Sequence, residues 1–455
     1  MNTYGFNLKL DIYGGSHDEK IGMTLDGIPA GEEIDFEALR RFMARRAPGN
    51  DPYSTKRKEP DEPVFLSGFD GNVTTGGRIE AIIYNKNQHS SDYSGVYDIP
   101  RPSHADFAAI MKYGHKVDLR GGGHFSGRLT APMCIAGGIC LQILAKKNIH
   151  VGAHILSVGK GAPDISFHET DVSKADFDLI HSHSFPTISE ECGIEMKKII
   201  EDARLDCDSV GGVVECAATG LPVGLGEHMF MGVEARISNV VFGIPAVKGI
   251  EFGRGFGSAA LRGSENNDPF KIKDGKAVTK TNNCGGILGG MTNGMPIIFR
   301  AAVKPTPSIA KEQDSISLSK MENTKLAIKG RHDPCIVPRA VPVFEAACAL
   351  AVMDMLLDRN SNAEFDLNEL RNEINKTDFD IVSLFKQRMD IVTAVAEYKK
   401  EHGLPILDEK REAALLERIA SMAGDELAEY AKELYRTMMK VSRSYQAKKL
   451  DCPEE

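Results

Sequence analysis

The pattern of hydrophobic positions changes near residue 360 of this 455-residue chain. From Leu367 to about Lys400, apolar side chains recur every three or four residues, and no Gly or Pro interrupts them. This spacing predicts one helix of roughly 50 Å, at 1.5 Å per residue. Gly403 and Pro405 then supply the expected stop signals.

Two shorter helices are predicted to follow the long one. Asp408 can cap a helix that ends near Ser421, and another helix should run from about Glu426 to Ala447. Two short helices cannot bury the whole apolar stripe of a helix as long as the first. The pattern therefore predicts that this region packs against a partner chain.

The residues before position 360 have a different character. They contain short apolar runs divided by Gly and Pro, and only Gly403 and Gly424 of the 44 glycines lie beyond that point. The stretch 358–366 is polar and is predicted to be a linker. We therefore expect one domain over residues 1–357 and a helical domain over residues 367–455.

Composition restricts the possible functions. With 42% hydrophobic residues, 26% charged residues and a net charge of −9, the chain is unlike proteins that coat nucleic acid or anionic membranes. The longest apolar stretch, 341–357, contains Glu345 and Asp354, so no membrane span is expected. Nine cysteines without C-x-x-C pairs indicate reduced thiols and no metal site. Without signal-peptide features at the N-terminus, these observations predict a cytoplasmic protein.

Polar side chains occur at regular offsets along the predicted C-terminal helices. Four segments carry them: Leu370–Ile374, Tyr398–Lys400, Asp408–Glu412 and Ser442–Gln446. Together they resemble the all-helical chorismate mutases over residues 367–447. The resemblance implies a substrate-binding set on these helices, with Arg371 reaching the site of a neighbouring subunit. The set is Arg371, Arg388, Lys399, Asp408, Glu412, Ser442 and Gln446.

The chemistry of that family explains these residue types. Rearranging chorismate to prephenate needs no nucleophile, so the protein must hold a dicarboxylate compactly and stabilise charge on the ether oxygen. Guanidinium groups bind carboxylates bidentately. By the resemblance, Lys399 and Gln446 are the catalytic donors to the ether oxygen. Two alternatives stay open: a solvated helical bundle, and a regulatory module that binds chorismate or an aromatic amino acid without rearranging it.

The N-terminal region carries glycine-rich turns among Arg, Lys and His clusters. Such turns let backbone N–H groups approach an anion, and the cations can neutralise it. Histidines near it could exchange protons at neutral pH. The main blocks are Gly14–His17, Arg45–Gly49, Thr55–Glu59, Arg101–Asp106, Arg120–Gly123, Gly285–Gly290, Lys304–Ser308 and Arg331–Cys335.

Taken in order, these blocks resemble chorismate synthase across residues 1–357. The resemblance implies an α+β fold, a β-α-β layered sandwich that assembles as a tetramer, whereas the mutases form helical dimers. It also implies elimination of phosphate from 5-enolpyruvylshikimate 3-phosphate to give chorismate, with reduced FMN required. The product of this reaction is the substrate of the mutase, so a fusion of the two has a functional logic.

The same resemblance assigns roles to individual residues. His17 would protonate the reduced flavin, His104 would protonate the departing phosphate, and Asp333 would assist removal of the ring proton. The substrate would contact Arg46, Arg57 and Arg128. The flavin would contact His124, Phe125, Ser126, Pro245, Ala246, Gly289, Lys304, Pro305, Thr306, Pro307, Ser308 and Arg331.

Several positions depart from the family pattern. Gly15 replaces an acid before His17, Asp18 follows it, and Pro245 replaces an asparagine near the flavin. His124 and Phe125 stand where Arg and Ser are usual. These changes leave the acid–base candidates in place but argue against reduction of the flavin by NADPH. They also motivate an alternative, in which the mutase is fused to a catalytically degenerate synthase-like scaffold.

Overall fold

A computed structural model describes residues 3–49, 61–85, 97–273, 275–328, 333–361, 367–405 and 407–450. The chain divides into two compact units, Met1–Ser361 and Asn362–Glu455. The larger unit combines sheets with helices, and the smaller one is helical.

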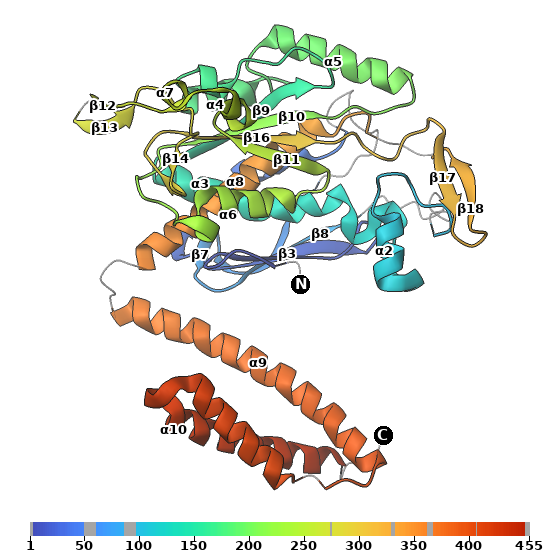
Figure 1. Cartoon of the computed structure of the whole chain (residues 1–455), viewed down its shortest axis with the longest axis vertical. Coiled ribbons are helices and arrows are strands. Elements are labelled where there is room, and N and C mark those ends of the chain that lie inside the picture. The colour runs from blue at the N-terminus through green and yellow to red at the C-terminus, as the bar shows by residue number, and fades with distance from the viewer. Residues whose placement is uncertain are drawn as a thin grey trace. The chain divides into compact units, whose positions relative to one another are not determined.

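The larger unit has three layers, in which helices lie between two antiparallel sheets (Figure 1). One sheet has the strand order β1-β2-β3-β8-β5. Its inward-facing side chains, such as Leu10, Met23 and Ile79, are fully or almost fully buried. Its strands are β1 (Thr3–Tyr4), β2 (Lys9–Tyr13), β3 (Lys20–Asp26), β8 (Ile79–Tyr84) and β5 (Val64–Ser67).

The second sheet has the strand order β11-β16-β10-β9. It is covered on its outer side by α4 (Lys174–Ser182) and α5 (Glu190–Leu205) (Figure 1). Residues 214–218 of β10 are all fully buried, so both faces of this central strand are covered. The strands are β9 (His150–Val158), β10 (Gly212–Thr219), β11 (Val247–Phe252) and β16 (Ile297–Val303).

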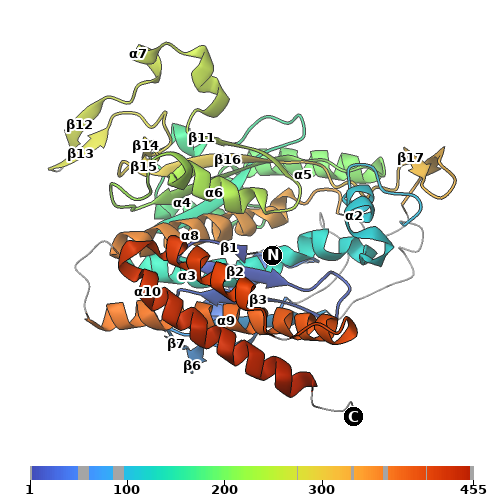
Figure 2. The ribbon, with the colours of Figure 1, turned by 60° about the horizontal axis from the view of Figure 1, so that its bottom comes forward.

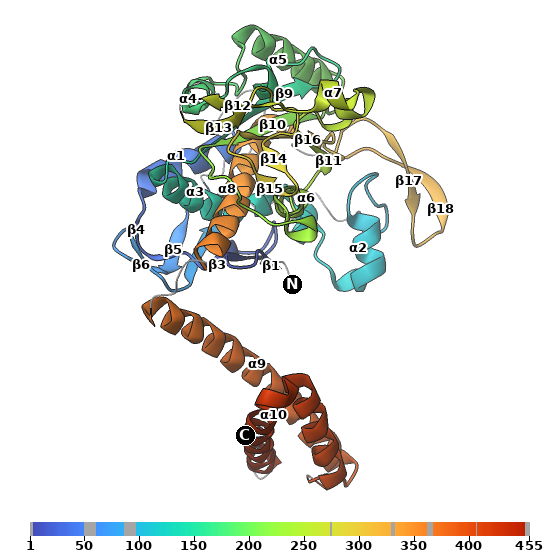
Figure 3. The same cartoon turned by 60° about the vertical axis from the view of Figure 1, so that its left-hand side comes forward.

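The middle layer consists of α1 (Phe36–Arg46), α3 (Thr130–Lys146), α6 (Val233–Phe242) and α8 (Val337–Ser361), as Figure 3 shows from the side. Helices α3 and α8 approach each other closely. A Cβ on Gly137 would lie 2.4 Å from the Cα of Ala346, so only glycine permits this contact. The arrangement confirms the predicted α+β, β-α-β layered sandwich.

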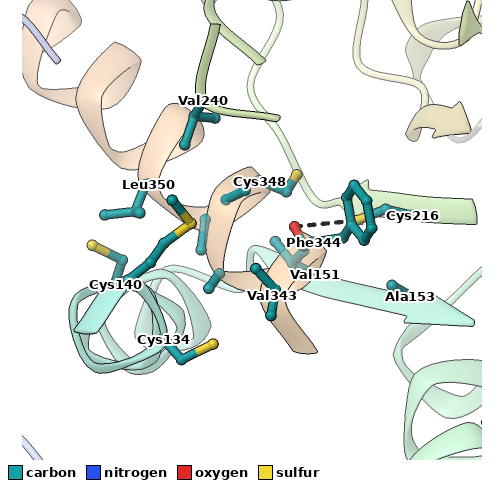
Figure 4. Close-up of a cluster of buried hydrophobic side chains, with 14 of the residues drawn as sticks. Cys134, Cys140, Val151, Ala153, Cys216, Val240, Val343, Phe344, Cys348 and Leu350 are labelled. Atoms are coloured by element: carbon teal, nitrogen blue, oxygen red, sulfur yellow. Dashed lines mark hydrogen bonds between the residues drawn. The ribbon is translucent and has the colours of Figure 1, made fainter. Parts of the chain in front are cut away.

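Buried thiols fill part of the core between the helices and the second sheet (Figure 4). Cys134, Cys140, Cys216 and Cys348 are all fully buried. Burial raises the pKa of the Cys134 thiol to about 12, so this side chain stays protonated. Cys348 is therefore a small core residue of α8.

Smaller elements decorate the layers. A hairpin near residue 275 and the short helix before it reach outward from the rest of the unit (Figure 2). The remaining strands are β4 (Ala30–Glu33), β6 (Phe69–Asp70), β7 (Val73–Thr75), β12 (Phe270–Lys273), β13 (Lys276–Thr279), β14 (Ile287–Leu288), β15 (Met291–Thr292), β17 (Gln313–Ser317) and β18 (Glu322–Leu326). The remaining helices of the unit are α2 (Asp106–Tyr113) and α7 (Gly263–Asn266).

Two helical stretches, Gly127–Lys146 and Val337–Asp358, are long and apolar enough to cross a membrane. However, 78% and 89% of their most apolar windows lie buried in the protein. The charges expected to interrupt the second stretch are buried and paired. Glu345 binds Arg45 through two hydrogen bonds of 2.6 and 2.8 Å, and Asp354 accepts from the backbone N–H of Leu8 at 2.8 Å. Both stretches are core helices of this unit.

The start of the predicted linker is helical. Residues 358–361 continue α8, although the sequence analysis placed them in the linker 358–366. The reason is that the Asp358 side chain accepts hydrogen bonds from Asn7 and Arg236, which hold the end of α8 against the rest of the larger unit. The helix therefore ends about one turn later than its polar composition indicated.

The smaller unit consists of α9 (Leu367–Glu401) and α10 (Glu409–Leu450). Gly424 breaks α10 with a φ of 74°, so three helical segments are present, as the sequence predicts. Their apolar surface is incompletely covered within one chain. Among the described side chains of α9, seven large apolar ones are each more than half exposed: Ile374, Phe379, Ile381, Val382, Leu384, Ile391 and Tyr398.

Candidate active sites

A cavity of about 440 Å³ opens in the larger unit, between the end of α1, the start of α8 and four loops. It gathers residues from distant parts of the sequence, from Arg46 to Val343. Twelve of the predicted site residues line it: Arg46, His104, Phe125, Ser126, Arg128, Pro245, Ala246, Lys304, Thr306, Pro307, Ser308 and Asp333.

A glycine turn separates the two candidate acid–base histidines. A Cβ on Gly121 would lie 2.3 Å from Cε1 of His17, and one on Gly122 would lie 3.5 Å from Nε2 of His104. Gly121 and Gly122 both have positive φ, at 57° and 90°. The Ser16 N–H donates to the Gly123 carbonyl at 3.1 Å, which fastens the His17 loop to this turn. The two histidines therefore lie on either side of one glycine turn, although His104 lines the cavity and His17 does not.

A buried carboxylate orients His104. Asp106 accepts a hydrogen bond of 2.7 Å from His104 Nδ1 and two of 2.6 and 2.7 Å from Arg101. Burial acts to raise the pKa of Asp106, but the hydrogen bonds from Arg101 and His104 hold it well below its ordinary value. The anionic partner on Nδ1 directs the other ring nitrogen, Nε2, toward the glycine turn.

Two arginines at another part of the cavity share one carboxylate. Asp61 accepts one hydrogen bond from Arg46 and one from Arg128 through its two oxygens. Arg46 also donates from Nε to the Thr130 hydroxyl and from Nη2 to the Gly127 carbonyl, both at 3.1 Å. The cavity thus presents guanidinium groups whose directions are fixed by the protein.

Asp333 lies across the cavity at the start of α8. Arg339 donates to its carboxylate at 2.7 Å, and the Nε of the same arginine donates to the Arg46 carbonyl at 3.1 Å. One side chain therefore links Asp333 with the end of α1. Both Asp333 and Arg339 line the cavity.

The remaining wall suits a flavin. Phe125, Ile244, Pro245 and Val343 supply apolar surface for a planar ring. Lys304, Thr306 and Ser308 supply a cation and hydroxyl groups for a phosphate. Burial and the nearby Lys248 ammonium lower the pKa of Lys304, and its Nζ donates to the Ser103 carbonyl.

Some predicted flavin contacts lie elsewhere. His124 does not line the cavity, and its Nδ1 bonds the Gly14 carbonyl at 2.8 Å, which makes it a second tie to the His17 loop. Gly289, in the β14–β15 turn, and Pro305 do not line it either. Arg57 and Arg331 lie outside the described residues.

Four residues at this site were missed as individual candidates. Arg101 and Asp106 lie in the same block as His104, and a carboxylate two residues after a histidine was a readable signal. Asp61 and Arg339 belong to no motif that we quoted. Their roles follow only from side-chain contacts that the fold creates.

The smaller unit brings several predicted mutase residues together between α9 and α10. Arg388 donates to the Ser442 hydroxyl, and Gln446 donates from Nε2 to the Val392 carbonyl at 3.3 Å. Ser442 and Gln446 are buried. Lys399, eleven residues after Arg388, lies on the same face of α9 because eleven residues make just over three whole turns.

The other predicted mutase residues have different surroundings. The Glu412 carboxylate accepts from Arg443, a residue that the sequence analysis did not include. Asp408 caps α10, since its Oδ1 accepts from the Arg411 N–H at 3.0 Å. Arg371 is exposed near the start of α9.

In the described part of the chain, no group of three or more His, Cys, Asp or Glu side chains is placed to hold a metal ion. The side chains gathered at the two candidate sites include cations, amides, hydroxyls, an imidazole and carboxylates. The larger unit has the features of an anion-binding lyase with room for a planar cofactor. The smaller one has those of a helical isomerase that binds a dicarboxylate.

Comparison with known proteins identifies the family. The chorismate synthase family model matches residues 8–357, and the model for chorismate mutase type II matches residues 370–447. The chain belongs to the chorismate synthase family and carries a chorismate mutase domain after it. The predicted fusion, with both enzyme activities, is thereby confirmed.

Individual relatives support the assignment. The chain is 44% identical over 366 residues to the chorismate synthase of Lancefieldella parvula, covering 78% of this chain and 96% of that protein. It is 45% identical over 355 residues to that of Thermococcus kodakarensis, with 78% and 97% covered. A crystal structure of chorismate synthase aligns with a TM-score of 0.63 and 27% identity, over 82% of this chain and 98% of the other.

Proposed function

We propose that the two units catalyse successive steps, with reduced FMN bound in the cavity of the larger one. The observation that carries the proposal is the glycine turn that fits between His17 and His104 at a cation-lined cavity. The larger unit converts 5-enolpyruvylshikimate 3-phosphate to chorismate, and the smaller converts chorismate to prephenate. When bound, reduced FMN supplies the electron-rich partner that the first reaction requires.

The elimination breaks a ring C–H bond and the C–O bond to phosphate, and a new double bond forms between the ring carbons. His104 would give a proton from Nε2 to the leaving phosphate, while Asp106 holds the imidazole by Nδ1. Asp333 would accept the ring proton, and His17 would hold a proton against the flavin. Arg46 and Arg128 would bind the anionic groups of the substrate.

The flavin would lie against Phe125, Pro245 and Ala246, with its phosphate near Lys304 and Ser308. On the departures from the family pattern at His124, Phe125 and Pro245, we propose that the flavin is not reduced by NADPH at this chain. Of the predicted contacts, Gly289, Pro305 and His124 need another arrangement of their loops to reach the flavin.

In the smaller unit, Arg388 would bind a substrate carboxylate while Lys399 and Gln446 donate to the ether oxygen. One N–H of the Gln446 amide goes to the Val392 carbonyl, and its second N–H is the donor for the substrate. An amide stays neutral at all working pH, so this donor needs no protonated carboxylic acid. This charge stabilisation distinguishes a mutase from a module that only binds chorismate.

We further propose that the chain is a homo-oligomer and acts in the cytoplasm. The exposed apolar stripe of α9 would be covered by a second copy, whose Arg371 would complete the neighbouring mutase site. Eight cysteines in the described residues are free thiols, which fits a reducing compartment. No nucleic acid or membrane partner is part of this proposal.

The proposed acid–base roles are tested by single-turnover measurements on His17→Ala and His104→Ala under anaerobic conditions with reduced FMN. Phosphate release should fall by roughly 10²–10⁴-fold in each. Binding of oxidised FMN, followed by its fluorescence, should stay within a few-fold of wild type in His104→Ala. Normal phosphate release in either variant would contradict the role assigned to that histidine. Absence of turnover in the wild-type chain would contradict the synthase activity itself, and is the outcome expected of a degenerate scaffold.

A further inference from the structure

Asp61 holds two cavity arginines but does not itself line the cavity. Its side chain is completely buried. We propose that Asp61 is a positioning residue, which fixes Arg46 and Arg128 in the directions that the phosphorylated substrate requires. The proposal rests on the chorismate synthase activity of the larger unit.

The charge balance of the group requires such a residue. Two buried guanidinium groups side by side would repel each other and turn apart. Burial acts to raise the pKa of Asp61, but the two guanidinium charges have the larger effect and hold the pKa below its ordinary value. The carboxylate is therefore ionised. Two positive charges and one negative charge leave the group with one net positive charge for an anion.

The contacts around Asp61 leave Arg46 little freedom. All three of its guanidinium nitrogens have acceptors in the protein: Asp61, the Thr130 hydroxyl and the Gly127 carbonyl. The Thr130 hydroxyl in turn donates to Gly127 at 2.6 Å. A cation that is oriented before the substrate binds does not have to reorganise during the reaction.

Arg128 connects this group of charged side chains to the loop that carries His17. Its Nε donates to the Asn85 side chain at 3.1 Å. The Asn85 amide then donates to the Asp18 carbonyl at 2.8 Å and approaches the Gly15 carbonyl at 3.4 Å. Asp61 therefore stands at one end of a polar chain that reaches the loop of His17.

The backbone at Asp61 supports a role for the direction of its side chain. Its φ is 49°, in the left-handed region that Asp adopts more readily than most residues but still at a cost. This conformation lies just before β5 and turns the carboxylate inward between the two arginines. A small free-energy cost in the backbone is thus offset by two charge-assisted hydrogen bonds.

The test is Asp61→Asn in the full-length chain. The amide has nearly the same shape, but its NH₂ group cannot accept from a guanidinium, so one arginine must turn away. We expect kcat for phosphate release to fall about 100-fold, with KM changing less than about 3-fold. A purely electrostatic role predicts the opposite pattern, a lower KM and an unchanged kcat, because the site gains positive charge.

Two further variants separate positioning from stability. Asp61→Glu keeps the charge and should recover roughly 10-fold of the lost kcat, whereas a merely structural defect would not be rescued by this bulkier residue. Thr130→Val removes one hydrogen-bond acceptor of Arg46, while the side chain at position 130 keeps nearly the same shape and stays uncharged. This variant should lower kcat about 5-fold. Affinity for oxidised FMN should stay within about 2-fold of wild type in each variant.

Either of two results would overturn the inference: full kcat in Asp61→Asn, or, if that variant does not fold, full kcat in Thr130→Val. Wild-type turnover in the same assay keeps this outcome distinct from a failure of the assigned activity itself.

Discussion

At the scale of single residues, the synthase site depends on a missing side chain. Gly121 contacts His17, and the neighbouring Gly122 lies close to His104. A glycine turn is usually explained by its backbone conformation alone. At Gly121 the space is needed as well, because the His17 imidazole occupies the place where a side chain would stand.

Gly121→Ala should therefore inactivate the synthase. The added methyl group would displace His17, whose Cε1 lies 2.3 Å from its position, and would be strained at a φ of 57°. We expect phosphate release to fall by at least about 100-fold. The matched control is Gly114→Ala, which has a similar φ of 72° but where a Cβ meets no atom within 4 Å. Equal activities of the two variants would contradict the account.

The sequence revealed the residues of this site better than their contacts. His17 and the glycine triplet were both identifiable, but about a hundred positions separate them, and no spacing rule brings them together. Asp61 escaped notice because a lone acid carries no pattern. His124 was misleading for a similar reason, since its position in a motif did not disclose that it bonds the Gly14 carbonyl.

At the scale of elements, α8 combines a membrane-like hydrophobicity with buried charges. Glu345 is fully buried among apolar residues, yet it binds Arg45 and His181 and accepts from the Ala153 N–H at 3.2 Å. Burial acts to raise the pKa of Glu345, but the charge of Arg45 and the hydrogen bond from His181 lower it from 4.5 to about 2. The carboxylate therefore links α8 to α1, α4 and β9.

This pKa gives a prediction for stability. Because the folded-state pKa is depressed, ionised Glu345 contributes stability above about pH 4.5, and the contribution is lost as the pH falls toward 2. The contribution is on the order of 3 kcal/mol. The free energy of unfolding, measured with urea, should fall over this pH range more steeply for the wild type than for Glu345→Gln. Parallel pH dependences would show that Glu345 is not ionised in the folded protein.

The sequence predicted the type of these elements more reliably than their ends. Helical periodicity gave α9 and the two segments of α10, because an amphipathic pattern is a local property. The linker was predicted to begin at residue 358, whereas α8 continues to Ser361, because Asp358 is held by Asn7 and Arg236, which are distant in the sequence. Polar composition alone could not distinguish this helix end from a linker.

At the scale of the whole molecule, two sites on one chain should be separable by single substitutions. Lys399→Ala should lower prephenate formation by about 10³-fold and leave chorismate formation intact, because it removes a donor to the ether oxygen. His104→Ala should have the opposite effect. Lys400→Ala, at the neighbouring exposed position, is the control for Lys399. If Lys399→Ala retains full mutase activity, the helical unit does not act as we propose.

The most direct measurement is an anaerobic time course that starts from 5-enolpyruvylshikimate 3-phosphate and reduced FMN. Following this substrate, chorismate and prephenate together reports both units in one sample. The account predicts loss of the phosphorylated substrate, transient chorismate and accumulation of prephenate, all from the single chain. Conversion of added chorismate without consumption of the phosphorylated substrate would contradict it.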